Sequence, residues 1–247
     1  MDVGSCRTLS GPVAEVGGQQ LREYDSRNLF DVWSLIMAQV MRLRSSRRAY
    51  LQLMRELAPL RHLFLMGGFA EDALLDHKIT RDRSDLDLLV EFDLWNMVLT
   101  QLHGVGIARF EPLFSGPAGN PLAFGSIDRG FKVEVWLTTR LTDGYAIVLP
   151  GEASIKGSSF FRLRLPADTF QFPNTTLEGV FVQTISPLAL SLLRATSAQT
   201  RGDSQKRAED LKVLERLARK FLLRRDPTDL IPEITELRVG ARSSQNQ

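Results

Sequence analysis

Two aspartates separated by one residue are the side chains of this sequence best suited to chemistry. Asp85 and Asp87 lie in the segment DLDLLV, whose apolar pattern is typical of a β-strand. Residues i and i+2 of a strand point to the same face, so we expect both carboxylates on one side of a sheet. Like charges held this close repel each other unless a cation lies between them, and hard oxygen ligands suit Mg²⁺. The spacing therefore predicts a magnesium site able to support phosphoryl or nucleotidyl transfer.

A third carboxylate would complete such a site, and Glu134 in the segment FKVEVWL is the best candidate. The alternation leaves Glu134 on the face opposite to the apolar residues Phe131, Val133, Val135 and Leu137. Glu134 is expected to act as a metal ligand, as a general base for an acceptor hydroxyl, or as both. The alternative is an outward glutamate on a half-exposed strand. Weaker candidates for the third carboxylate are Asp128, Glu91 and Asp93.

A glycine pair upstream of the aspartates is suited to binding phosphate. The apolar run of residues 62–66 predicts a strand that ends at Gly67 and Gly68, and the segment FAEDALLDH predicts a helix directly after them. Glycines allow the backbone to approach a triphosphate closely, and the first turn of the helix offers free N–H groups. Arg81 lies close enough in the sequence to help neutralise the phosphates.

This ordered set of residues resembles a known family. The stretch LFLMGGFAEDALLDHKITRDRSDLDLLVEF is similar to the signature of the nucleotidyltransferase superfamily, most of all to that of the small aminoglycoside and lincosamide nucleotidyltransferases. The matching residues are Gly67, Gly68, Phe69, Ala70, Asp72, Thr80, Arg81, Asp85 and Asp87. Two positions depart from the family pattern. Arg83 stands where many relatives have a histidine, and Glu134 stands where they have a third aspartate.

The resemblance implies a role for each of these residues. It implies Asp85, Asp87 and Glu134 as catalytic Mg²⁺ ligands, and Gly67 and Gly68 as contacts to the triphosphate. Near the C-terminus the segment KRAEDL resembles a K-D-x-x-D-L element of the family, which implies that Lys206 reaches the nucleotide phosphates.

The implied function is transfer of a nucleoside monophosphate from a nucleoside triphosphate, with ATP the first choice, to a hydroxyl of a small molecule. An aminoglycoside or lincosamide antibiotic is the expected acceptor, which would make the protein a resistance enzyme. Two alternatives stay open. One is a toxin-type nucleotidyltransferase that acts on tRNA or protein. An RNA acceptor stays an alternative because a basic cluster could contact it, namely Arg42, Arg44, Arg47 and Arg48. The other is a non-catalytic, nucleotide-binding regulatory protein.

The elements that must position these residues alternate between helices and strands. We expect a flexible leader at residues 1–27, a nucleotidyltransferase domain with N-terminal helices at residues 28–185, and a helical region at residues 186–240. Short β-like runs lie at residues 107–110, 121–127, 131–137, 145–149, 160–165 and 179–185. The predicted fold class is α/β (α+β), with a nucleotidyltransferase-like mixed sheet flanked by helices and a helical C-terminal portion.

Composition excludes several other classes of protein. Hydrophobic residues make up 43% of the 247 residues and the formal net charge is +2, so neither a disordered chain nor a strongly cationic nucleic-acid binder is indicated. The sequence has no apolar run of the roughly 20 residues that a membrane span needs, and no signal peptide at its start, so a cytoplasmic location is expected. The three histidines and Cys6 lack metal-ligand spacing, which argues against zinc.

Overall fold

The computed structural model describes residues 47–81, 83, 85–128, 131–150, 159–200, 202–222 and 231–238. These residues belong to one compact unit, Leu43–Gln247, and begin in a helix at residues 47–57. The predicted leader, the predicted N-terminal helical segment from residue 28 to residue 46, Cys6, Arg42 and Arg44 lie outside the described residues. No helix of the described part of the chain is long and apolar enough to cross a membrane.

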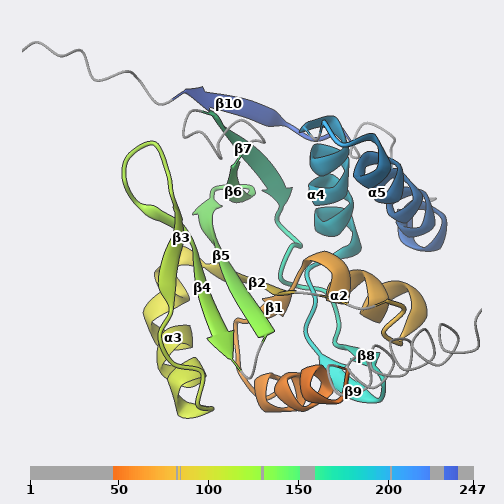
Figure 1. Cartoon of the computed structure of the whole chain (residues 1–247). Coiled ribbons are helices and arrows are strands. Elements are labelled where there is room, and N and C mark those ends of the chain that lie inside the picture. The colour runs from red at the N-terminus through yellow and green to blue at the C-terminus, as the bar shows by residue number, and fades with distance from the viewer. Residues whose placement is uncertain are drawn as a thin grey trace, which may run out of the picture. The chain divides into compact units, whose positions relative to one another are not determined.

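The described strands form a mixed eight-stranded sheet and a small separate hairpin (Figure 1). The main path of the sheet is β1 (Phe64–Leu65), β2 (Asp85–Glu91), β5 (Phe131–Leu141), β6 (Gly144–Pro150), β7 (Ser159–Pro166) and β10 (Ile234–Arg238). Off this path, β4 (Pro121–Asp128) pairs with β5 and with β3 (Glu111–Ser115). The hairpin is β8 (Thr175–Leu177) and β9 (Val180–Val182).

The central pair of the sheet is β2 and β5, which run parallel. Their register sets Asp85 opposite Lys132 and Asp87 opposite Glu134. On its other edge β5 pairs first with β4 and then, from residue 138 onward, with β6. At the start of this pair Lys132 is exposed and Asp85 is partly buried, whereas Glu134, two residues further along β5, is buried.

Helices cover the sheet. The first helix after β1 does not begin after the two glycines, as the sequence predicts, but at them: α2 (Gly67–Glu71) starts with Gly67 and continues as the π-helical turn η1 (Asp72–Asp76). After β2 the 3₁₀ turn η2 (Phe92–Leu94) opens α3 (Trp95–Gly104). Later in the chain come α4 (Pro187–Thr200) and α5 (Ser204–Leu217), which ends in the turn η4 (Ala218–Leu222). This arrangement confirms the predicted mixed α/β class.

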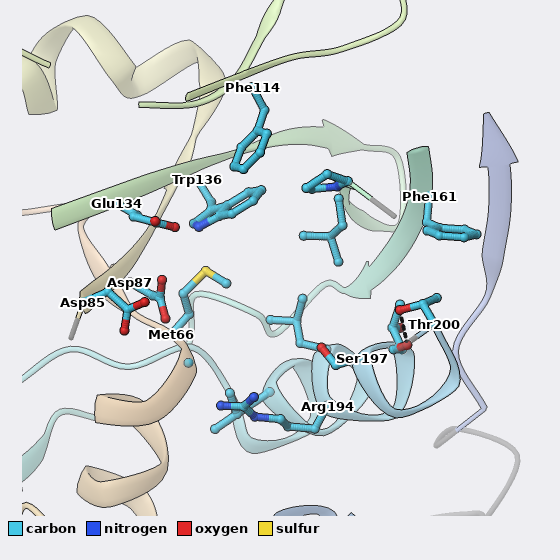
Figure 2. Close-up of a pocket in the computed structure, with 16 residues that line it drawn as sticks. Met66, Asp85, Asp87, Phe114, Glu134, Trp136, Phe161, Arg194, Ser197 and Thr200 are labelled. Atoms are coloured by element: carbon cyan, nitrogen blue, oxygen red, sulfur yellow. Dashed lines mark hydrogen bonds between the residues drawn. The ribbon is translucent and has the colours of Figure 1, made fainter. Parts of the chain in front are cut away.

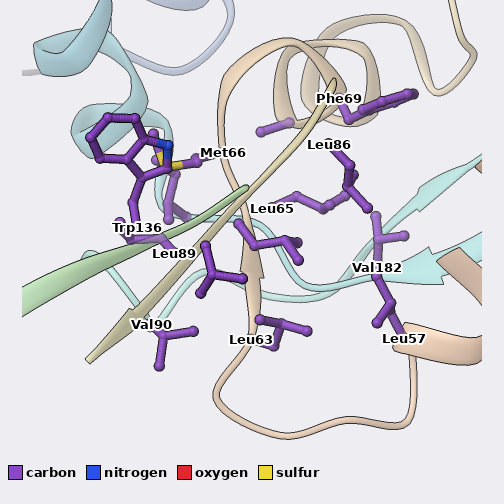
Figure 3. Packing of buried hydrophobic residues seen from close by; sticks show 14 of the residues in the cluster. Leu57, Leu63, Leu65, Met66, Phe69, Leu86, Leu89, Val90, Trp136 and Val182 are labelled. Carbon is purple, nitrogen blue, oxygen red and sulfur yellow. The ribbon is translucent and has the colours of Figure 1, made fainter. Parts of the chain in front are cut away.

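The hydrophobic core lies around β1 and β2 (Figure 3). Leu86, Leu89 and Val90 of β2 are fully buried and belong to one apolar cluster with Leu65 and Phe69. Burying one such side chain contributes roughly 1.5–3 kcal/mol. Because this packing fixes the apolar residues of β2, it also fixes the direction in which Asp85 and Asp87 point.

Three details differ from the sequence expectations. Residues 107–110 do not form a strand, because Arg109 adopts a left-handed conformation (φ 66°) that an extended chain cannot include. The region 186–240 is not helical throughout, since its segment ITELR alternates as a strand and pairs with the edge of β7 as β10. Helical spacing in residues 203–223 also predicts one apolar face made of Leu211, Leu214, Leu217, Ala218 and Phe221, but on α5 Leu211 is 49% exposed, whereas Leu217 is buried in the core.

Candidate active site

Three carboxylates meet at one end of a cavity between the sheet and α4 (Figure 2). The cavity holds about 460 Å³, and Asp85, Asp87 and Glu134 all line it. Asp85 and Asp87 come from the same face of β2, and Glu134 lies across from Asp87 on β5. The residue Glu134 is only 8% exposed. It therefore faces this cavity and is not an outward glutamate on a half-exposed strand.

The electrostatics of Asp87 reflect this crowding. The pKa of its carboxyl is raised from 3.8 to about 7, first by burial and then by the neighbouring charges of Asp85 and Glu134. Arg194 and Lys132 act in the opposite direction, but they do not offset the effect. At neutral pH the carboxylate cluster therefore carries more negative charge than the protein alone stabilises.

Lys132 is a member of the site that the sequence interpretation did not single out. Its ammonium group forms an ion pair with Glu134, two residues further along the same face of β5. This hydrogen bond is the main reason why the pKa of Lys132 is raised above its usual value, and Asp85 and Asp87 add to the effect. The side chain of Lys132 is 50% exposed, whereas its partner Glu134 is buried, so the ion pair supplies a positive charge to a carboxylate that has little contact with solvent.

The two glycines bring the first turn of α2 directly against other side chains. Gly67 has a φ of +60°, and a Cβ atom there would collide with the carboxylate of Asp87. A Cβ atom on Gly68 would collide with the guanidinium group of Arg83. The N–H of Met66 also donates to the carbonyl oxygen of Asp87 at 3.0 Å. Backbone and carboxylate are therefore held in contact beside the cavity, which Gly67 lines.

Arg83 links the loop before β2 to α2 and η1. Its Nη2 lies 2.9 Å from the carboxylate of Asp72 and donates to the carbonyl oxygen of Gly68 at 2.8 Å. Asp72 also accepts a hydrogen bond of 2.5 Å from the hydroxyl of Thr80. The side chains of Arg83 and Asp72 are 8% and 3% exposed. Asp72 and Thr80, which belong to the motif that carries the family resemblance, thus hold the loop before β2 against η1.

Arg194 of α4 is the cation that lines the cavity among the described residues. It forms ion pairs with Glu71 at the end of α2 and, at 2.9 Å, with Asp210 of α5. Both partners are buried, so this arginine ties three helices together at the cavity wall. Asp210 belongs to the segment KRAEDL, and its contact with Arg194 gives a physical reason for an acidic residue at that position.

The remaining candidates lie elsewhere. Arg81 pairs with Glu209 at 3.1 Å over a separate groove between η1 and α5, and Lys206 is an exposed residue in the first turn of α5. Glu91 lies at the far end of β2, where it pairs with Arg140, and Asp93 is exposed in η2. None of these four residues lines the cavity, and the side chain of Asp128 lies outside the described residues.

The far end of the cavity differs from the carboxylate end. Trp136 follows Glu134 on the same face of β5 and stacks on Phe114 of β3, with ring centroids 5.5 Å apart. Phe161 of β7 and Thr200 at the end of α4 lie beyond them (Figure 2). The hydroxyl of Thr200 donates to the carbonyl of Thr196, which leaves its oxygen able to accept a further hydrogen bond.

A divalent metal fits the chemistry of the carboxylates. In the part of the chain described here, no three His, Cys, Asp or Glu side chains lie close enough together to hold a metal ion as they stand, and Glu134 is paired with Lys132. Asp85 and Asp87 nevertheless offer hard oxygen ligands, and the raised pKa of Asp87 marks a place where added positive charge would be stabilising. A bound cation would neutralise the part of the carboxylate charge that Lys132 and Arg194 do not.

The chain is similar in structure to solved nucleotidyltransferases. One is ANT(2")-Ia in complex with adenylyl-2"-tobramycin, at 16% identity over 64% of this chain and 78% of that one, with a TM-score of 0.45. Another is the lincomycin-bound lincosamide antibiotic adenylyltransferase LnuA, at 17% identity, 77% and 96% coverage and a TM-score of 0.40. A third is an antigenic nucleotidyltransferase-like protein from Paracoccidioides brasiliensis, at 19% identity, 68% and 72% coverage and a TM-score of 0.36. No protein-family model and no curated protein sequence matches the chain.

Proposed function

We propose that this protein is a nucleotidyltransferase that moves a nucleoside monophosphate from a nucleoside triphosphate to a hydroxyl of a small molecule. One observation carries the proposal: Asp85, Asp87 and Glu134 converge from two parallel strands on one end of a cavity beside the Gly67 turn. The similarity to antibiotic nucleotidyltransferases is in keeping with it. ATP as donor, Mg²⁺ as metal, an aminoglycoside or lincosamide as acceptor and the cytoplasm as location are parts of the same proposal, as are the domain limits 28–185 and 186–240.

Each residue has a part in the proposed reaction. The acceptor oxygen forms a bond to the α-phosphorus while the bond to the α–β bridging oxygen breaks, so pyrophosphate leaves and the hydroxyl proton passes to a carboxylate. Asp85 and Asp87 would hold Mg²⁺, which when bound offsets the charge of the phosphates. Glu134 would complete this set or accept the proton, a role typically worth about 10² to 10⁴ in rate. Lys132 orients Glu134 through their ion pair.

Arg194 is the residue we add to the nucleotide-binding set of Gly67, Gly68, Arg81 and Lys206. It lines the cavity close enough to Asp87 to lower the pKa of that carboxyl. Its guanidinium can present further N–H donors to a phosphate while it keeps its buried partners. Arg81, in the loop before β2, and Lys206, on α5, both lie outside the cavity, so each of these segments would have to move for its cation to contact a nucleotide there.

The deciding experiment follows the label of α-³²P-ATP or α-³²P-GTP in the presence of Mg²⁺. The acceptors are tobramycin, lincomycin, total RNA and the protein itself, and the matched variants are Asp87→Asn and the exposed control Asp93→Asn. Label on an antibiotic, lost in Asp87→Asn and kept in Asp93→Asn, would support the proposal. Label on RNA or on the protein would overturn the small-molecule acceptor, and no label in any pool despite triphosphate binding would overturn the enzyme.

A second variant separates the two roles of Glu134. Glu134→Gln keeps the size of the side chain and removes its charge. If Glu134 is the base, the rate falls about 10² to 10⁴-fold while the Mg²⁺ concentration for half-maximal rate is unchanged. If Glu134 is a ligand, that concentration rises.

A further inference from the structure

The cavity has two chemically different ends. Its charged lining residues, as far as the chain is described, are Asp85, Asp87, Glu134 and Arg194, and Figure 2 shows them grouped at one end. The rest of the described lining is apolar, aromatic or hydroxyl-bearing. One cavity therefore offers both a place for phosphates and a place for an apolar group.

The direction of β5 indicates which ligand enters the apolar end. Trp136 is two residues after Glu134 on the same face, so the wall of the cavity runs from the carboxylates straight onto the stacked rings of Trp136 and Phe114. The turn at Gly67 lies at the carboxylate end, where the triphosphate would be held. If an acceptor hydroxyl approaches Glu134 from the side away from Gly67, the rest of the acceptor molecule must lie against these two rings.

The walls at this end also indicate what the acceptor can be. Leu149 and Pro150 of β6, Phe161 of β7 and Leu193 of α4 offer apolar contact, and Ser197 and Thr200 offer hydroxyls. A polycationic ligand would lose hydration here without meeting a carboxylate, because none of the described residues that line this end is acidic. A ligand with an apolar group would gain from leaving water, and its hydroxyls could bond to Ser197 and Thr200.

We propose that the apolar end of the cavity binds the acceptor, and that this acceptor is an amphiphilic hydroxylated molecule with at most one positive charge, not a polycationic aminosugar. This inference rests on the proposed function and narrows its acceptor class. The aromatic pair then contacts the acceptor and not the nucleobase.

The test measures binding without turnover, so it does not depend on transfer. The affinities of the full chain for lincomycin, which has one basic amine and an apolar chain, and for tobramycin, which has several amines, are measured by calorimetry. Thr200→Glu adds a carboxylate at the apolar end, and Thr200→Gln is the matched neutral control. The affinity for ATP with Mg²⁺ is measured on the same proteins.

We expect the unaltered protein to bind lincomycin at least roughly tenfold more tightly than tobramycin. Relative to Thr200→Gln, Thr200→Glu should shift this ratio toward tobramycin by about fivefold, as one partly exposed ion pair would. The affinity for ATP should change less than about twofold in either variant. Tighter binding of tobramycin by the unaltered protein, or loss of ATP affinity in both variants, would overturn the inference. A protein that binds lincomycin as expected but transfers no label would instead overturn the proposed function alone.

Discussion

Replacing Asp87 by asparagine should make the metal-free protein more stable at neutral and alkaline pH. The native carboxyl has a pKa of about 7, against an ordinary value of 3.8, because it is buried next to Asp85 and Glu134. Between pH 4 and 7 the native state therefore keeps a proton that the unfolded chain releases. The free energy of unfolding must fall as the pH rises through this window, and the cost is fully present above pH 7.

The size of the effect follows from the same two values. At about 1.4 kcal/mol per unit of pKa, the raised pKa of Asp87 lowers the free energy of unfolding by roughly 1.5 kcal/mol at pH 5, where the native carboxyl is protonated, and by up to about 4 kcal/mol at pH 8, where it is charged. Asparagine has nearly the same size and cannot ionise, so Asp87→Asn should recover most of this difference. For a chain of this length, 4 kcal/mol corresponds to a rise in Tm of roughly 8 °C or more.

The assay is urea unfolding of both proteins at pH 5 and pH 8, with EDTA present. Asp93→Asn, an exposed carboxylate outside the cavity, is the control and should match the unaltered protein at both pH values. Adding Mg²⁺ at pH 8 should stabilise the unaltered protein more than Asp87→Asn, because the cation replaces the missing positive charge. An Asp87→Asn protein that is no more stable than the unaltered one at pH 8 would refute the reasoning.

Three further substitutions test the framework around the site. Gly67→Ala places a Cβ atom on Asp87 at a left-handed φ, so it should cost roughly 1–3 kcal/mol in urea unfolding and impair nucleotidyl transfer; full activity would mean that the turn can shift freely. Arg83→Met leaves Asp72 buried without its cation, so we expect a loss of about 3–5 kcal/mol that adding Asp72→Asn partly restores, and equal stability of the single and double variants would contradict this. Leu217→Ala, at a fully buried position of α5, should cost about 2–5 kcal/mol by thermal unfolding, and a value below 1 kcal/mol would show that α5 does not pack as described.

Local pattern was enough to predict the carboxylates of the site but not their surroundings. Strand periodicity gave Asp85 and Asp87 a shared face and separated Glu134 from its apolar neighbours, because both inferences need only i, i+2 spacing. That Asp87 lies directly opposite Glu134 depends on the parallel pairing of β2 and β5, which lie more than 40 residues apart in the chain. Such a register depends on long-range packing and has no local signal.

The cations of the site also differ in whether local spacing or long-range packing determines their place. Lys132 could have been found, since it precedes Glu134 by two residues and therefore shares its face. Arg194 could not, because its place in the cavity wall depends on how α4 packs against α2 and α5. Conversely, the closeness of Arg81 to the aspartates in the sequence favours it as a phosphate contact, yet its side chain pairs with Glu209. Nearness along the chain is a weak guide to which charged side chain lines the cavity.

The wall that Arg194 contributes is made late during synthesis. Glu134 leaves the ribosome about 60 residues before Arg194 and about 75 before Asp210, which at roughly 5–20 residues per second is an interval of several seconds. During that time the carboxylates of β2 and β5 stay hydrated, while the apolar side chains destined for the cavity have no helix to cover them. The nascent chain therefore passes through a stage in which strands β1 to β7 have been made but α4, α5 and β10 have not, and apolar surface exposed at such a stage is prone to aggregate.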